Sequence, residues 1–278
     1  MSKGQRLIRA MLATLLLGSL SVQANEFAVP DPAQSQYWGP IRMLMFGDRE
    51  IVADENEVIR VYLNTRADDA STVPVMINGL IDQTPENYIK AVYLIVERNP
   101  SPAAGVFYFT PDSGRVKVET RLRFEDFSFV RAVAEMNDGR LFMSQRYVKA
   151  SGGCSAPMGK NLIPQALMGK MRFRIDDHIE YNKPTLVQVQ IRHPNESALA
   201  ADFNPDNTPQ FVRSVDVSYN GEPVMNAQVD FSLSDNPIFR FYFVPDREGE
   251  LKVDVEDTHD KTYSQSLRIV EGAPPIGG

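Results

Sequence analysis

Alternation of apolar and polar residues is the feature that most constrains this chain. Residues 187–192 read VQVQIR, residues 251–256 read LKVDVE, and residues 116–123 read VKVETRLR. A period of two places one set of side chains on a buried face of a strand and the other set in water. Helical periodicity is nearly absent, so the pattern predicts an all-β protein. In the third stretch, it places Arg121 and Arg123 on the wet face.

Short turn motifs separate these runs. Asn137-Asp138-Gly139 and Asn220-Gly221 each lie between two alternating stretches. Asn and Gly tolerate the positive φ that tight hairpins require, so both motifs predict antiparallel hairpins. We count about seven or eight candidate strands before residue 150 and about seven after residue 170. This spacing predicts two immunoglobulin-like antiparallel β-sandwich domains, at 25–150 and 171–270.

Residues 151–170 interrupt the alternation. They contain Gly152, Gly153, Gly159 and Gly169 together with Pro157 and Pro164. Glycine loosens a chain and proline stiffens it, so this stretch predicts a linker between the two sandwiches. Residues 25–40 predict a polar, proline-containing lead-in, and residues 271–278 predict a flexible tail.

The first 24 residues have the layout of a signal peptide. Lys3, Arg6 and Arg9 precede an apolar stretch at 10–20, and Val22-Gln23-Ala24 follows. This apolar stretch is shorter than a membrane span, and the small-x-small triplet is what signal peptidase cuts. We expect cleavage after Ala24 and export to a bacterial periplasm; the alternative is an uncleaved anchor or a buried N-terminal helix.

Composition excludes several classes of function. The 278 residues carry a formal net charge of −7, which disfavours a nucleic-acid partner. No other apolar run approaches a membrane span. His178, His193 and His259 are far apart and lack metal-motif spacing, so we expect surface or loop histidines and no metal site. Nucleotide-binding and hydrolase fingerprints are absent as well, and no cofactor is expected.

Cys154 is the one cysteine, and it lies within Gly152-Gly153-Cys154-Ser155. A lone cysteine is often a small buried hydrophobe. Its neighbours here are small and polar, and an unpaired cysteine in an exported protein suggests a reactive thiol. We therefore expect an exposed thiol in a flexible segment, at which a Ser substitution would change stability by no more than ~0.5 kcal/mol. A Cys–His thiol hydrolase is an alternative, although catalytic nucleophiles usually sit on rigid elements.

An ordered series of short motifs runs through both halves of the chain. The motifs of the first half run from Tyr88-Ile89-Lys90 through Glu97-Arg98-Asn99-Pro100 and Thr110-Pro111-Asp112 to Gly152-Gly153-Cys154. Those of the second half are His193-Pro194, Asn220-Gly221, Asn236-Pro237 and alternating phenylalanines at 239–243. The first set resembles SoxY and the second resembles SoxZ, the two subunits of the SoxYZ sulfur carriers of thiosulfate oxidation. The fused order resembles the SoxYZ-like carriers associated with quinoprotein dehydrogenases.

The resemblance implies two docked sandwiches and a role without catalysis. Cys154 would hold sulfur intermediates of the thiosulfate type covalently, Gly152 and Gly153 would form a swinging arm, and periplasmic redox enzymes of the Sox type or a quinoprotein dehydrogenase would load and unload the thiol. The alternative is a binding module that docks a quinoprotein dehydrogenase, with the thiol incidental. Ser155 and Ala156 replace the glycines that usually follow the SoxY cysteine, and an arm anchored at both ends reaches less far than a free tail.

Overall fold

The computed structural model describes residues 29–54, 57–158, 163–176, 178–272 and 276–277. The predicted signal peptide at 1–24 lies outside the described residues. Within them, no helix is long and apolar enough to cross a membrane.

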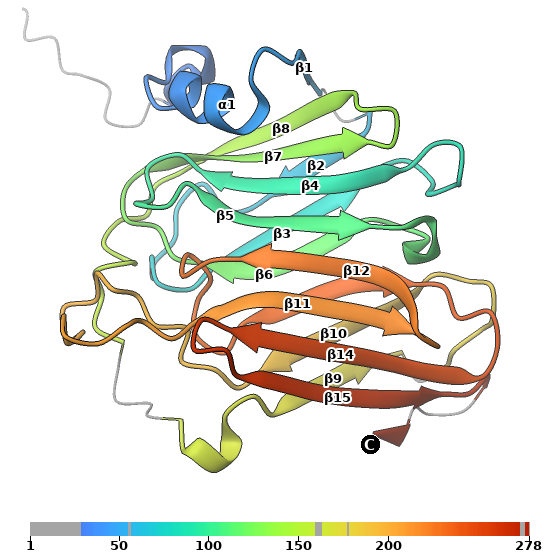
Figure 1. Ribbon diagram of the computed structural model, residues 1–278. Helices are drawn as coiled ribbons and strands as arrows, with labels where there is room; N and C mark the ends of the chain where they lie inside the picture. Colours follow the sequence, from blue (N-terminus) through green and yellow to red (C-terminus); the bar gives the residue numbers. More distant parts are fainter. Residues whose placement is uncertain (1–28, 55–56, 159–162, 177, 273–275, 278) are drawn as a thin grey trace, which may run out of the picture.

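Strands make up most of the regular secondary structure of the described residues, as the alternation predicted (Figure 1). The first half contains β1 (Ile51–Ala53), β2 (Ile59–Tyr62), β3 (Val73–Gly79), β4 (Ile89–Val96), β5 (Ala103–Phe109), β6 (Lys117–Leu122), β7 (Ser128–Met136) and β8 (Leu141–Val148). The second half contains β9 (Met171–Ile175), β10 (Thr185–Ile191), β11 (Val212–Tyr219), β12 (Glu222–Val229), β13 (Ile238–Phe243), β14 (Gly249–Asp257), β15 (Thr262–Ile269) and β16 (Ile276–Gly277). The helices are α1 (Trp38–Phe46) and the 3-10 turns η1 (Pro32–Gln34), η2 (Pro111–Ser113) and η3 (Gln165–Leu167).

These strands form two stacked sheets that run through both halves of the molecule. The ten-stranded sheet has the order β1-β8-β7-β4-β5-β12-β11-β14-β15-β16, and the six-stranded sheet has the order β2-β3-β6-β13-β10-β9. Pairing of β5 with β12 and of β6 with β13 joins the halves edge to edge. Two sandwiches are therefore present, but they share their sheets rather than only touching.

One hydrophobic core fills the space between the sheets along both halves. Phe107 on β5, Leu122 on β6 and Phe241 on β13 are almost fully buried within it. The pairing of edge strands explains this continuity, because it removes the exposed edges that two separate sandwiches would leave.

Both predicted hairpins are confirmed. Gly139 connects β7 to β8 at a φ of 89°, and Asn220 and Gly221 connect β11 to β12 at φ values of 51° and 87°. These are left-handed conformations that Asn and Gly adopt at low cost.

The two ends of the chain differ from the prediction. Helix α1 overlaps the expected lead-in, and its Phe46 packs on Ile95 and Val133 at the outer face of the ten-stranded sheet. Gly47 ends the helix at a φ of 60° and donates its N–H to the Met43 carbonyl. Near the C-terminus, β16 adds a short strand to the edge of β15 within the expected flexible tail.

Candidate functional site

The thiol of Cys154 is buried, with a relative exposure of 0%. The expectation of an exposed thiol is therefore wrong for this conformation. The thiol segment, residues 151–155, leaves the end of β8 and lies against the loop between β6 and β7, and it also contacts the loop at 193–201. Both halves of the molecule therefore enclose the thiol.

The two glycines before Cys154 are docked rather than free. Gly152 donates its N–H to the Glu125 carbonyl at 2.9 Å, and Gly153 donates its N–H to the Phe124 carbonyl at 2.7 Å. Gly152 has a φ of 78°. At Gly153, a Cβ atom would lie 2.0 Å from the Ala70 carbonyl oxygen. In this conformation, the first glycine permits a left-handed turn and the second permits a close backbone approach.

The Glu125 carboxylate holds the next two residues. It accepts hydrogen bonds from the backbone N–H of Cys154 at 3.1 Å and of Ser155 at 3.0 Å, and from the Ser155 hydroxyl at 2.9 Å. From the second half, the Ser197 hydroxyl donates to the Cys154 carbonyl at 2.8 Å. Hydrogen bonds to an ionised acceptor are stronger than neutral ones, so Glu125 is the main polar anchor of the segment.

The residues that hold the thiol segment, Ala70, Phe124, Glu125 and Ser197, form a seat for it. The electrostatics of this seat favour the protonated thiol. Burial raises the pKa of the Cys154 thiol to about 12, with the negative charge of Glu125 adding to the shift and the cation of Arg123 opposing it. Because the thiolate is the nucleophile, a thiol in this seat is nearly unreactive at neutral pH. Chemistry at Cys154 requires the segment to leave its seat.

Arg123 is the central residue between the halves. It is 6% exposed, although the alternation placed it on a wet face. Strand β6 ends one residue earlier, and the Arg123 side chain then donates to the carbonyls of Asn195 at 2.8 Å, Phe231 at 2.9 Å and Leu233 at 2.5 Å. Burial lowers the pKa of Arg123, while the negative charge of Asp235 opposes that shift.

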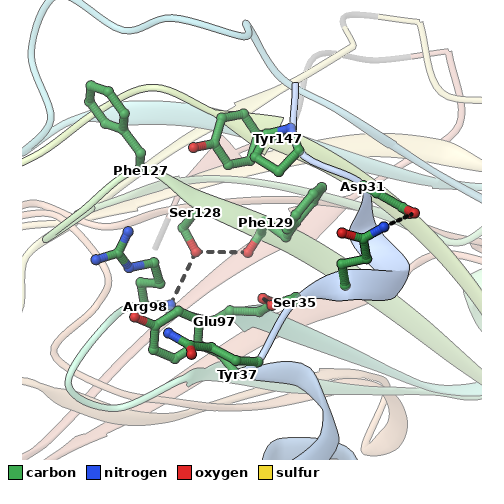
Figure 2. A pocket seen from close by; sticks show the side chains of 12 residues that line it. Asp31, Ser35, Tyr37, Glu97, Arg98, Phe127, Ser128, Phe129 and Tyr147 are labelled. Carbon is green, nitrogen blue, oxygen red and sulfur yellow. Dashed lines mark hydrogen bonds between the residues drawn. The ribbon is translucent and has the colours of Figure 1, made fainter. Parts of the chain in front are cut away.

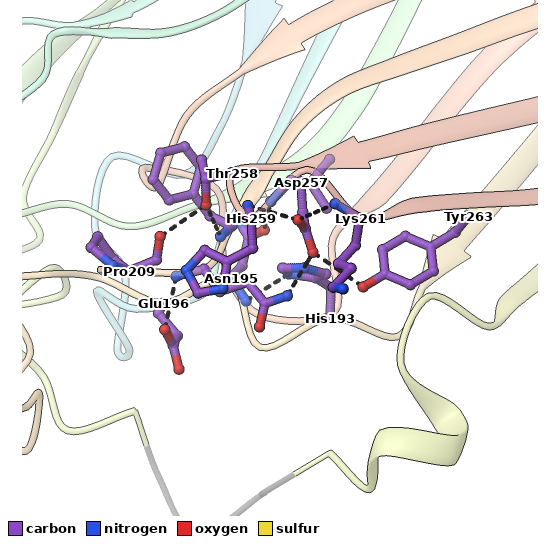
Figure 3. Close-up of polar contacts among 12 residues, drawn as sticks. His193, Asn195, Glu196, Pro209, Asp257, Thr258, His259, Lys261 and Tyr263 are labelled. Carbon is purple, nitrogen blue, oxygen red and sulfur yellow. Dashed lines mark hydrogen bonds and ion pairs between the residues drawn. The ribbon is translucent and has the colours of Figure 1, made fainter. Parts of the chain in front are cut away.

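A second buried polar cluster lies at the start of the loop at 193–201 (Figure 3). His193 lies in the loop after β10, in keeping with the expectation of a surface or loop histidine, but it has no exposed surface. Its Nδ1 accepts the Asn195 N–H at 3.1 Å, which leaves Nε2 to donate toward Asp257 Oδ2 at 3.4 Å. Burial lowers the pKa of His193, so the ring is neutral.

The Asp257 carboxylate is satisfied from several sides. Its oxygens accept from the Gln210 amide at 2.6 Å, the Tyr263 hydroxyl at 3.1 Å and the N–H groups of His259 and Lys261. These bonds lower the pKa of Asp257 although burial opposes them. In the part of the chain that the structure describes, no group of three His, Cys, Asp or Glu side chains is placed to hold a metal ion.

A surface hollow of about 390 Å³ opens beside η1 (Figure 2). Tyr37, Phe127, Phe129 and Tyr147 contribute rings to its wall. Its charged groups already have partners inside the protein: Glu97 forms a buried ion pair with Arg131, and Arg98 pairs with Asp126. We therefore assign the hollow no ligand.

Each half of the chain matches the profile of a known protein family. The profile of sulfur oxidation protein SoxY matches residues 42–154, and the profile of sulphur oxidation protein SoxZ matches residues 173–268. The chain belongs to the SoxYZ family of sulfur-oxidation carriers. The SoxY match ends at Cys154, inside the predicted linker at 151–170, and the rest of that linker lies between the two matches.

Solved structures with similar folds are distant from this SoxYZ chain. The SoxY sulfur carrier protein from Chlorobium limicola f thiosulfatophilum is 19% identical, covers 41% of this chain and 91% of its own, and has a TM-score of 0.33. Superoxide reductase (neelaredoxin) from Ignicoccus hospitalis is 14% identical, with 34% and 80% covered and a TM-score of 0.29. The fibronectin(III)-like modules of Clostridium thermocellum CbhA are 13% identical, with 77% and 93% covered and a TM-score of 0.22. A comparison with curated proteins gives no match. The family assignment rests on the two profiles.

The sequence points to Cys154, Gly152 and Gly153, but no local pattern in it points to the residues that hold them. Glu125, Arg123 and Ser197 lie 29, 31 and 43 residues from Cys154 along the chain, and no spacing motif links them. The one usable signal was that Arg123 follows a strand directly and precedes the apolar Phe124. Asn195 is also fully buried: its side-chain amide donates to the Leu233 carbonyl and accepts the Val212 N–H.

Proposed function

We propose that this chain is a periplasmic covalent carrier that holds sulfur intermediates on Cys154 and presents them to partner redox enzymes. The observation that carries the proposal is the end of the SoxY match at Cys154, the chain's one cysteine. Gly152 and Gly153 precede it, as in the swinging arm that the resemblance implied.

Loading is an oxidation that a partner must complete. The Cys154 thiol and thiosulfate join through a new S–S bond, giving a Cys–S–S–SO₃⁻ adduct, one proton and two electrons. The electrons pass to the partner redox enzyme, which is the oxidant of the step. A partner of the quinoprotein dehydrogenase type supplies an electron acceptor of this kind.

The buried seat defines what the carrier cycle needs. Glu125 would repel both a thiolate and an anionic adduct, because all carry negative charge. An adduct also has more atoms than the thiol, and the seat at Gly153 is already closely packed. Loading therefore favours a released segment, while the unloaded thiol returns to its seat, protected from oxidation.

Burial of the thiol also favours a second candidate function. A buried cysteine with a raised pKa is typical of a structural residue. In that case, the double sandwich is a binding module that docks a quinoprotein dehydrogenase, and Cys154 is incidental.

Intact-mass analysis separates the two. The protein is isolated from its own host during oxidation of sulfur compounds, beside a Cys154→Ala variant. The carrier function predicts a mass increase of one or more sulfur or sulfonate groups that dithiothreitol removes and that the variant lacks. An unmodified mass, together with unchanged oxidation by the variant strain, supports the binding module. N-terminal sequencing of the same sample is expected to begin at Asn25.

A further inference from the structure

The outer face of the six-stranded sheet is strongly cationic. This sheet is the rear layer in Figure 1. A single row of paired residues crosses all six strands on this face, in the order Tyr62, Met76, Glu119, Arg240, Gln188 and Arg174. The alternate residues of the same strands face the core, so this row and its neighbours point outward.

Charge on this sheet is opposite in sign to that of the whole protein. Its six strands carry Arg60, Lys117, Arg121, Arg172, Arg174 and Arg240, and one acidic residue, Glu119. The ten strands of the other sheet carry slightly more acidic than basic residues, and the chain has a net charge of −7. Such segregation of charge onto one face is what steers a protein toward a partner of opposite charge.

Most of these cations are not neutralised within the protein. Glu119 lies 3.1 Å from Arg240 and 3.7 Å from Lys117. Among the described residues, the other four cations of the face make no ion pair. Arg172 and Arg174 are exposed on the edge strand β9, where they are directly accessible.

Apolar side chains interleave with the cations. The centre of the Arg60 guanidinium lies 4.9 Å from the centre of the Tyr62 ring, and Met76 is half-buried on the neighbouring strand. Leu186 and Tyr242, which pair with each other farther across the sheet, are also half-buried. Arginine, tyrosine and methionine are enriched in protein–protein interfaces, whereas an electrostatic contact with lipid or nucleic acid needs only the cations. This composition favours a folded protein as the occupant.

We propose that the outer face of the six-stranded sheet is a docking surface for a protein partner with an acidic face. Arg121 connects this surface to the thiol end of the molecule, because it donates to the Asn236 carbonyl at 3.1 Å in the loop that follows Leu233. A partner on this face would therefore border the end where Cys154 is seated. The proposal goes beyond carriage of sulfur and does not depend on thiol chemistry.

Site-specific photo-crosslinking in the native host identifies the occupant. Benzoylphenylalanine replaces Gln188 at the centre of this face or, as a matched control, Gln228 on the ten-stranded sheet. We expect a protein adduct with an acidic surface at position 188 and none at 228. The same adduct in a Cys154→Ser background separates docking from carriage, because docking persists when the thiol is absent. Absence of a position-188 adduct would overturn the proposal.

Titration of this protein with the purified crosslinked partner tests whether binding depends on the cations of the six-stranded sheet. The double variant Arg172→Glu/Arg174→Glu is expected to weaken binding by about tenfold or more, and higher salt is expected to weaken the wild type. Lys90→Glu/Arg146→Glu places the same charge change on exposed positions of the other sheet and is expected to have little effect. Equal losses in both double variants, or none in either, contradict the proposal. Phosphatidylglycerol vesicles and single-stranded DNA are tested in the same way. If either one binds, loses its binding in Arg172→Glu/Arg174→Glu, and no protein binds, the face is a lipid or nucleic-acid surface and the proposal is overturned.

Discussion

The SoxY and SoxZ halves meet in two regions of opposite construction. Where β5 pairs with β12, backbone hydrogen bonds and buried apolar side chains such as Phe107 join the halves. Around the thiol, the contacts are polar and pass between side chains and backbone: Glu125 and Ser197 hold the segment, and Arg123 holds the loops. Extensive apolar burial resists separation, whereas a few hydrogen bonds can exchange with water at small net cost. We therefore expect the paired strands to be the permanent joint and the thiol segment, held by Glu125 and Ser197, to be the part that opens.

Removal of a side chain from the permanent joint has the largest expected effect. Phe107 is paired with Val92 on one side and Ala227 on the other, and it has no exposed surface. Phe107→Ala is expected to lower the free energy of unfolding by about 3–5 kcal/mol, because it leaves a cavity where the halves join. Urea denaturation measures this. Phe127→Ala, at an exposed phenylalanine, is the control and should change stability by less than about 0.5 kcal/mol; an equal loss in both would contradict a joint centred on Phe107.

Arg123→Leu tests the polar side of the comparison. The substitution leaves three carbonyls of the SoxZ half without their buried donor, so we expect a loss of about 3 kcal/mol in the free energy of unfolding. Arg98→Leu, at a surface ion pair, is expected to cost less than about 1 kcal/mol. If Arg123→Leu costs no more than Arg98→Leu, the guanidinium does not hold the halves together.

Gly153→Ala tests only the close contact between the thiol segment and the residues that hold it. A Cβ at this position would meet the Ala70 carbonyl, so the docked segment must shift. We expect a loss of about 1–2 kcal/mol in stability and faster alkylation of Cys154 under native conditions. Gly39→Ala, where an added Cβ meets nothing within 4 Å, is the matched control and should leave the alkylation rate unchanged. Slow alkylation in both variants would mean that the glycine contact does not hold the thiol in place.

The smallest expected effect is the pH dependence contributed by His193. Burial lowers its pKa in the folded state, so below about pH 6.5 the unfolded chain binds more protons than the folded one. The free energy of unfolding should therefore fall as the pH drops from about 7 to 5. His193→Gln should flatten this slope, and His178→Gln, at an exposed residue, should not. An unchanged slope in His193→Gln would show that another group titrates.

Local pattern was sufficient for the strands but not for the seat. Alternation and the Asn-Gly turns describe contacts between chain neighbours, so the hairpins and the all-β class followed from them. Arg123 shows the limit, because alternation says nothing about a residue one position beyond the strand end. Cys154 shows it again: small polar neighbours suggested exposure, whereas Glu125 and Ser197, distant in sequence, satisfy the backbone of the segment and allow it to be buried. Helix α1 was missed because its apolar residues surround the helix rather than follow a clear stripe.

Denaturant-dependent alkylation of Cys154 tests most directly whether the thiol segment can open by itself. The alkylation rate is measured at rising urea concentrations below the unfolding transition, giving the free energy of exposure and its dependence on urea. A segment released on its own predicts an exposure free energy below that of global unfolding and a much smaller urea slope, because little surface is uncovered. An exposure free energy and slope equal to those of global unfolding would contradict this, and would make Cys154 a structural core residue rather than a carrier thiol.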